Sequence, residues 1–320
     1  MAIWIQEKSM KAVFLDAKTL GDDVDLSPIE SVTGGLEKYD RTTPDQILER
    51  IRGFDTVLVN KVVLTREHFD ACPELKTIAV VATGLNNIDQ AAAKDHGIKV
   101  MNVTNYGRST VAQHTMALML ALATRLLDYT RDVQAGHWGK SDMFCLMDHP
   151  IMELEGRTLG IVGYGDLGQG VAERAAAFGM KVLLGARPGQ EPGVVDGYSR
   201  IPLDELLPQA DVVSLHCLLT DETRDLIGAR ELKMMKPDSL LINTSRGGLV
   251  NEQALADALR AGEIGGAGFD VLTEEPPRNG NPLLADDIPN LIVTPHSAWA
   301  SREARQRIVG ITAVNLKSVL

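Results

Sequence analysis

Short apolar runs that suit β-strands alternate with helical stretches along the whole chain, and this alternation constrains the fold more than any other feature of the sequence. Apolar strands of this kind are typical of parallel sheets that are covered by helices on both faces. The expected strands are residues 12–15, 56–60, 77–82 and 99–103 in a first group, and residues 158–162, 181–184, 212–216, 239–243, 266–271 and 291–293 in a second. The sequence therefore predicts an α/β protein with two doubly wound parallel sheets.

A long helix is expected between the two groups, from residue 110 to about residue 135, because this stretch is rich in Ala, Leu and Met. Either Ser109 or Thr110 can cap it, and His114 within it suits the core or an interface better than a ligand site. Residues 136–155 are polar and broken by Gly and Pro, which is typical of a loop. A helix over residues 301–320 follows the last strand and could pack back onto the first group. At roughly 150 residues per domain, 320 residues fit two domains.

Charge and composition exclude several classes of protein. Lys and Arg number 32 against 43 Asp and Glu, and the net charge of −11 argues against binding to nucleic acid. The longest apolar helical stretch, residues 116–127, is shorter than the roughly 20 residues that a membrane span needs, so no membrane partner is expected. The N-terminus lacks the pattern of a secretory signal, and we expect the first nine residues to add nothing to the fold.

The three cysteines, Cys72, Cys145 and Cys217, are too few and too scattered for a disulfide framework or a zinc site. We therefore expect a reducing, cytoplasmic location. No other cluster of ligand-type residues suggests a metal.

A glycine-rich motif follows the expected strand 158–162 directly. Gly163, Gly165 and Gly168 form a G-x-G-x-x-G pattern, with Asp166 and Leu167 inside it, and a helix-forming segment comes next. Between a strand and a helix, this pattern is typical of dinucleotide binding. The first glycine allows a tight turn, the second admits the pyrophosphate, and the third lets helix and strand pack closely. A mere tight turn is the structural alternative.

The end of the next strand bears on the choice of dinucleotide. An NAD-binding unit usually carries Asp or Glu about 20 residues past the glycines, where it binds the ribose 2′-hydroxyl. Ala186 lies 18 residues past Gly168 and cannot accept that bond, whereas the adjacent Arg187 suits a 2′-phosphate. The pattern favours NADP(H) and leaves NAD(H) open. The alternative is that Arg187 is a solvated surface residue.

Three polar residues follow apolar segments of the second group in turn. Arg246 comes after the strand 239–243 and Thr244, Glu275 lies in the segment after Asp270, and His296 follows the last strand. Ligands of open parallel sheets bind at the carboxyl ends of the strands. Singly, each has a plain structural reading: a surface charge, a loop carboxylate and a structural histidine.

Four further strings complete a resemblance to a known family. They are residues 80–89 (VVATGLNNID), 111–115 (VAQHT), 216–220 (HCLLT) and 295–300 (PHSAWA). With the motifs above, the chain resembles the D-isomer-specific 2-hydroxyacid dehydrogenases over essentially its whole length, and within them the glycerate dehydrogenase and hydroxypyruvate (glyoxylate) reductase branch.

The resemblance implies a Rossmann nucleotide-binding domain, residues 105–295, inserted into a flavodoxin-like substrate domain, residues 1–104 and 296–320. It also implies a homodimer. The family's catalytic residues fall on Arg246, Glu275 and His296, and its substrate-binding residues on Thr83, Gly84, Arg246 and Trp299. Its cofactor-binding positions fall on the glycine motif (Gly163, Gly165, Asp166, Leu167, Gly168) and on Ala186, Arg187, His216, Cys217, Thr244 and Asp270. His137 and Trp138 could reach a neighbouring subunit, although a plain loop position is the more ordinary reading.

The chemistry of these residue types agrees with reduction of a 2-keto acid. Arg246 can hold the carboxylate and polarise the carbonyl, and an imidazolium at His296 can protonate the alkoxide. Glu275 can favour that charged imidazole. The expected reaction is the reversible reduction of hydroxypyruvate or glyoxylate. The alternatives are another small 2-hydroxy acid, phosphite, or a dinucleotide-sensing scaffold without catalysis.

Overall fold

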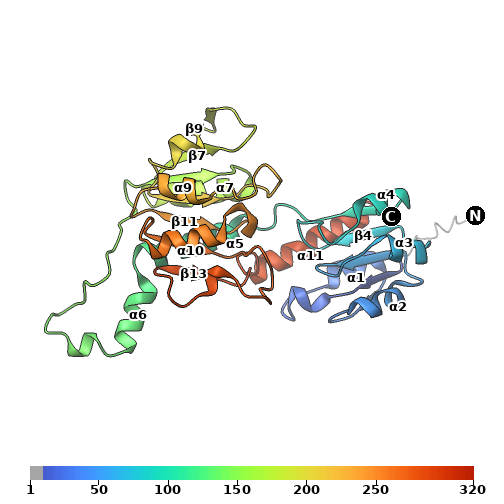
Figure 1. Ribbon diagram of the computed structural model, residues 1–320. Coiled ribbons are helices and arrows are strands. Elements are labelled where there is room, and N and C mark those ends of the chain that lie inside the picture. The colour runs from blue at the N-terminus through green and yellow to red at the C-terminus, as the bar shows by residue number, and fades with distance from the viewer. Residues whose placement is uncertain (1–9) are drawn as a thin grey trace, which may run out of the picture. The chain divides into compact units, whose positions relative to one another are not determined.

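The computed structural model describes residues 10–320, which form two compact units (Figure 1). The split unit comprises the described residues up to Tyr106 together with Ala300–Leu320, and the inserted unit is Gly107–Trp299. The expectation about the first nine residues concerns a segment outside the described part. Within residues 10–320, no helix combines the length and the apolar character needed to cross a membrane.

The split unit contains a five-stranded parallel sheet with the order β2-β1-β3-β4-β5. This order, with the first strand between the second and the third, is that of flavodoxin-like folds. Its strands are β1 (Ala12–Phe14), β2 (Leu36–Lys38), β3 (Thr56–Val59), β4 (Thr77–Val80) and β5 (Lys99–Met101). Its helices are α1 (Ser27–Thr33), α2 (Ile47–Ile51), α3 (Arg66–Ala71), α4 (Gln90–Asp95) and α11 (Arg302–Lys317). The last helix returns to this unit, packs on α1, and is capped by the Ser301 side chain (Figure 1).

The inserted unit contains an eight-stranded sheet with the order β13-β12-β11-β10-β6-β7-β9-β8. All neighbours are parallel except the short hairpin of β8 and β9. The strands are β6 (Thr158–Val162), β7 (Lys181–Ala186), β8 (Gly193–Val195), β9 (Tyr198–Pro202), β10 (Val212–Leu215), β11 (Leu240–Asn243), β12 (Gly266–Phe269) and β13 (Leu291–Val293). The helices α7 (Asp166–Ala177), α8 (Leu203–Leu206), α9 (Ala229–Met234) and α10 (Glu252–Arg260) connect them.

The direction of the chain through this sheet predicts where a ligand binds. From β6 the chain proceeds to β7 and β9 on one side, then crosses to β10 and continues to β13 on the other. The order therefore reverses between β6 and β10. In open parallel sheets, ligands bind at the carboxyl ends of the strands beside such a reversal.

The expected long helix is two helices, α5 (Arg108–Ala123) and α6 (Leu126–Gln134). They are separated at Arg125, whose backbone is left-handed with φ of 52° and whose Nε donates to the Asp128 carboxylate over 2.6 Å. That bond ties the residue before α6 to the first turn of this helix. The residue that precedes α5 is Gly107, so neither Ser109 nor Thr110 caps the helix.

Helix α5 lies close to the sheet because glycines face it. A Cβ atom at Gly268 of β12 would lie 3.1 Å from side-chain atoms of Leu118 and of Leu122. Much of the remaining α5 surface is buried. By contrast, α6 has no buried residue and, with the loop that follows it, stands away from the sheet (Figure 1).

Candidate active site

The glycine motif forms a tight turn between β6 and α7, at the reversal of strand order. Gly163 has φ of 100°, and a Cβ there would lie 2.5 Å from the backbone of Cys217. A Cβ at Gly168 would lie 2.2 Å from the Gly163 carbonyl oxygen. At Gly165, which precedes the first turn of α7, a Cβ would meet nothing within 4 Å. Gly163 and Gly168 therefore pack tightly against backbone atoms, whereas the space at Gly165 in front of α7 is open. A dinucleotide pyrophosphate fits this space, because the first N–H groups of a helix have no partners within the helix and can bind phosphate oxygens.

Two other residues of the motif interact with α5. The Asp166 carboxylate is paired with the Arg108 guanidinium over 3.3 Å, which reduces the negative charge at the helix N-terminus. Its second oxygen is buried without a partner among the described residues. Leu167 lies beside Gly107 at the start of α5.

The ends of β7 and β10 flank this turn. Ala186 is buried as the last residue of β7, and the guanidinium of Arg187 after it has no hydrogen-bond or ion-pair partner within residues 10–320. Burial raises the pKa of the Cys217 thiol, and Arg187 is near enough to offset part of that rise. The site therefore fits a ligand that brings its own negative charge.

His216 lies between Cys217 and the end of β10. Its Nε2 is 2.8 Å from the Ser214 hydroxyl, and its Nδ1 is buried without a partner in the described part of the chain. Burial lowers the pKa of His216 to about 4. The ring is therefore neutral near pH 7 and supplies no charge to a phosphate.

Arg246 is exposed at the carboxyl end of β11, and its Nη1 donates to the Ser245 carbonyl over 2.7 Å. The loop that follows is pressed against the loop that carries Glu275. A Cβ at Gly247 would lie 2.0 Å from the carbonyl carbon of Leu272. This contact explains why Arg246 is near enough to lower the pKa of the Glu275 carboxyl.

Glu275 and His296 form a direct pair. Nδ1 of His296 is 2.6 Å from Oε2 of Glu275, and both side chains are 35% exposed. The other carboxylate oxygen accepts a hydrogen bond from Leu272 N over 2.8 Å. Burial alone would raise the pKa of Glu275, but these two bonds outweigh it and hold the pKa below its usual value. An imidazole held by an ionised carboxylate can give and take a proton near neutral pH.

The turn that carries His296 belongs to the inserted unit. We expected residues 296–299 in the split unit, but the Asp270 carboxylate accepts hydrogen bonds from the N–H groups of Ser297 and Ala298. His296 itself has φ of 51°, which is uncommon for a residue other than glycine. Trp299 donates from Nε1 to the His296 carbonyl over 2.9 Å.

Three polar side chains of α5 reach the ends of the strands. Thr110 donates to the Ala298 carbonyl over 3.0 Å, and Thr115 lies 3.0 Å from the hydroxyl of the buried Thr244. His114 lies 3.0 Å from the Thr294 hydroxyl. The sequence analysis missed these contacts. The signal for two of them was a threonine and a histidine four residues apart, hence on one face of an apolar helix.

Thr83 and Gly84 belong to the split unit, after the end of β4. The Thr83 hydroxyl donates to the Val103 carbonyl over 2.9 Å, and Asn102 donates to the Thr83 carbonyl over 2.7 Å. These bonds fix the turn within its own unit. The other expected site residues all lie in the inserted unit.

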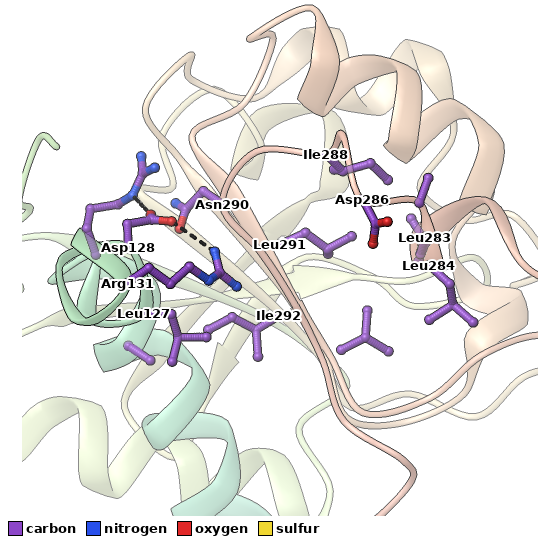
Figure 2. Close-up of a pocket in the computed structure, with 14 residues that line it drawn as sticks. Leu127, Asp128, Arg131, Leu283, Leu284, Asp286, Ile288, Asn290, Leu291 and Ile292 are labelled. Carbon is purple, nitrogen blue, oxygen red and sulfur yellow. Dashed lines mark hydrogen bonds and ion pairs between the residues drawn. The ribbon is translucent and has the colours of Figure 1, made fainter. Parts of the chain in front are cut away.

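A pocket of about 420 Å³ in the inserted unit contains none of these residues. Figure 2 shows Leu127, Asp128 and Arg131 of α6 at one side of it, next to Asn290 and Ile292, and Leu283, Leu284, Asp286 and Ile288 at the other. Asp128 bonds Arg125 and Arg131 at its rim.

Comparison with known proteins gives a consistent result. Residues 116–298 match the family described as D-isomer specific 2-hydroxyacid dehydrogenase, NAD binding domain. The glycerate dehydrogenase of Methylorubrum extorquens is 48% identical over 297 residues, which cover 92% of this chain and 91% of that relative. The hydroxypyruvate reductase of Blautia hydrogenotrophica is 38% identical over 316 residues, 97% of each. A solved acyclic imino acid reductase in complex with NADPH and D-Arg superposes with a TM-score of 0.78, at 29% identity and 93% coverage of both chains.

Proposed function

Because this chain belongs to the D-isomer-specific 2-hydroxyacid dehydrogenase family, we propose that it reduces hydroxypyruvate and glyoxylate to D-glycerate and glycolate. The observation that carries the proposal is the 2.6 Å pair of His296 and Glu275 with Arg246 beside it. The two relatives that are named for glycerate and hydroxypyruvate support the substrate class.

In the proposed reaction Arg246 binds the carboxylate of the 2-keto acid and polarises its carbonyl, because its guanidinium is charged and forked. When bound, the nicotinamide supplies the hydride to C2. His296 gives its proton to the C2 oxygen and takes it back in the reverse direction. Glu275 stabilises the imidazolium that precedes this transfer, and its lowered pKa keeps it ionised at neutral pH. Trp299, Thr83 and Gly84 are proposed to contact the substrate.

We also propose that NADP(H) is preferred over NAD(H). The support is the buried Ala186, which offers no carboxylate, beside an Arg187 guanidinium that has no partner among residues 10–320. The glycine turn and the backbone of Cys217, Thr244 and Asp270 at the neighbouring strand ends would contact the rest of the dinucleotide.

The test is a comparison of initial rates with NADPH and NADH across hydroxypyruvate, glyoxylate, pyruvate and phosphite. We expect turnover with the first two substrates, and faster with NADPH. Turnover of pyruvate alone would assign another 2-keto acid, and turnover of phosphite would assign that substrate. Binding of NADPH without turnover of any of the four would favour a dinucleotide-sensing scaffold.

We propose that two copies of the chain associate through α6 and the loop after it. This segment exposes many large apolar side chains, a pattern typical of interaction surfaces. They include Leu126, Val133, Trp138, Met143, Phe144, Met147 and Ile151, with Phe144 87% exposed. Light scattering on the protein as it elutes from a size-exclusion column should give twice the chain mass of 34.7 kDa. Replacing both Phe144 and Met147 by Ser should shift the measured mass toward that of one chain. A monomeric wild type would contradict the proposal.

A cytoplasmic location is part of the same proposal. It is supported by Cys72, Cys145 and Cys217, which are all unpaired in the described residues.

A further inference from the structure

The turn that carries His296 is fixed by one buried carboxylate. Asp270 is 1% exposed, and its oxygens accept hydrogen bonds from the Thr294 hydroxyl over 2.5 Å, from Ser297 N over 2.9 Å and from Ala298 N over 2.8 Å. Its carbonyl accepts from His296 N over 2.8 Å. These bonds hold the left-handed backbone of His296, a conformation that persists only where the surroundings determine it.

His114 of α5 reaches this carboxylate from the other side. Its Nε2 lies 3.0 Å from the Thr294 hydroxyl and 3.5 Å from Oδ1 of Asp270. Within residues 10–320, it is the one basic side chain within 4.0 Å of that carboxylate. Among the described residues, the Asp270 carboxylate is therefore surrounded by hydrogen-bond donors and by this one imidazole.

The directions of these bonds determine which nitrogen of His114 carries hydrogen. A threonine hydroxyl has a single hydrogen, and Thr294 donates it to the ionised Asp270. Its oxygen must then accept from His114, so Nε2 of His114 is protonated. A continuous path of hydrogen bonds runs from His114 through Thr294 to Asp270, which also accepts hydrogen bonds from the backbone N–H groups of the His296 turn.

We propose that His114 is a positioning residue for His296, acting through Thr294 and Asp270. The inference rests on the proposed function, because the effect is read in the proton transfer assigned to His296. An apolar residue would fill the place of His114 on the largely buried helix α5 but would leave the Thr294 oxygen without a donor. The turn would then lose part of the hydrogen-bond network that holds the His296 imidazole beside Glu275.

Steady-state kinetics of four variants test the path. His114→Leu should lower kcat by about 10-fold, the scale of one buried hydrogen bond, with KM for hydroxypyruvate within about twofold. His114→Gln keeps a donor near the same place and should recover most of kcat. Thr294→Val breaks the path at its middle. Adding His114→Leu to Thr294→Val should therefore cost nothing further, since both changes remove the same link.

The matched control is Gln113→Leu, the same gain of apolar surface at the exposed neighbouring position of α5. It should leave kcat unchanged. Equal losses in His114→Leu and His114→Gln, or losses that add in the double variant, would show that His114 only fills space and would overturn the inference. If His114→Leu does not fold, Thr294→Val and His114→Gln decide the question.

A second measurement does not depend on turnover. In protein labelled with ¹⁵N-histidine, His114→Leu should change the ring nitrogen shifts of His296, and His114→Gln should restore them. If the wild type turns over no substrate but these shifts respond, the proposed function fails and the positioning role stands. Unchanged His296 shifts in His114→Leu would overturn the role itself.

Discussion

At the scale of single residues, His296 is expected to be the proton donor. Its Nδ1 is held by Glu275, and its other ring nitrogen has no hydrogen-bond partner among residues 10–320, so it can face a substrate. His296→Asn should lower kcat for hydroxypyruvate reduction by roughly 10²–10⁴, the usual contribution of general acid catalysis. The Kd for NADPH, measured by fluorescence, should be unchanged. Undiminished turnover in this variant would remove His296 from the mechanism.

Arg246 is expected to act through the shape of its guanidinium as well as its charge. Arg246→Lys keeps the charge and loses the fork, so kcat/KM for hydroxypyruvate should fall by roughly 10²-fold or more. Thermal unfolding should be nearly unchanged, because the guanidinium is exposed and, within the described part of the chain, bonds only the Ser245 carbonyl. If the variant were less stable but had unchanged kinetics, the role of Arg246 would be structural and not catalytic.

The residue pair at the end of β7 is expected to select the dinucleotide. A charge-assisted hydrogen bond is worth about 1.5–3 kcal/mol, so kcat/KM should favour NADPH over NADH by roughly 10–100-fold. Combining Ala186→Asp with Arg187→Ala should reverse the order, because a carboxylate bonds the 2′-hydroxyl and repels the 2′-phosphate. The preference of the wild type should shrink as salt is added. Equal efficiency with NADH would leave Arg187 as a surface residue.

At the scale of structural elements, the loops after β11 and β12 are expected to act as one assembly. Gly247 brings the Arg246 loop so close to Leu272 that a Cβ would lie 2.0 Å from a backbone carbon. Gly247→Ala should therefore destabilise the protein by about 1–3 kcal/mol and lower kcat, because one loop must move. Chemical denaturation and kinetics measure the two effects.

Gly193→Ala is the matched control for that prediction. Gly193 begins β8 in the same unit, and a Cβ there would meet nothing within 4 Å. This variant should unfold and turn over like the wild type. If Gly247→Ala were equally silent, the two loops would not depend on their close contact.

At the scale of the whole molecule, stability is expected to fall in mild acid because of His216. Burial lowers its pKa from 6.5 to about 4, so between these values the unfolded chain binds a proton that the folded protein does not. The unfolding free energy should therefore decrease as pH falls from 6.5 to 4, by up to about 3 kcal/mol. Urea denaturation at pH 7 and pH 4.5 measures the decrease, and His216→Gln should reduce it. An equal decrease in wild type and variant would contradict this origin.

Much of the fold could be predicted from sequence because strands and turns depend on near neighbours in the chain. The bounds of β6 and β13 agree with the expected strands, and the turn at Gly163 follows β6 as the motif predicts. The strands β2, β8 and β9 were missed. β2 and β8 are three residues long and mostly exposed, and β9 includes Ser199, Arg200 and Pro202 among its five residues, so none of the three shows an apolar run. The break at Arg125 was missed because its left-handed backbone is uncommon for a residue other than glycine, and the residue types around it do not signal it.

By itself, the sequence determined the two alternations of strands and helices, the glycine turn, and the chain order of Arg246, Glu275 and His296. Only the tertiary structure gave the geometry of the expected pair of His296 and Glu275, 21 residues apart, and showed that His114 lies beside Thr294, 180 residues away. Local periodicity reflects which face of an element is apolar, and that can be read from adjacent residues. Contacts between distant residues depend on how closely the elements pack, as at Gly247 and Gly268, and that distance exists only in the folded chain.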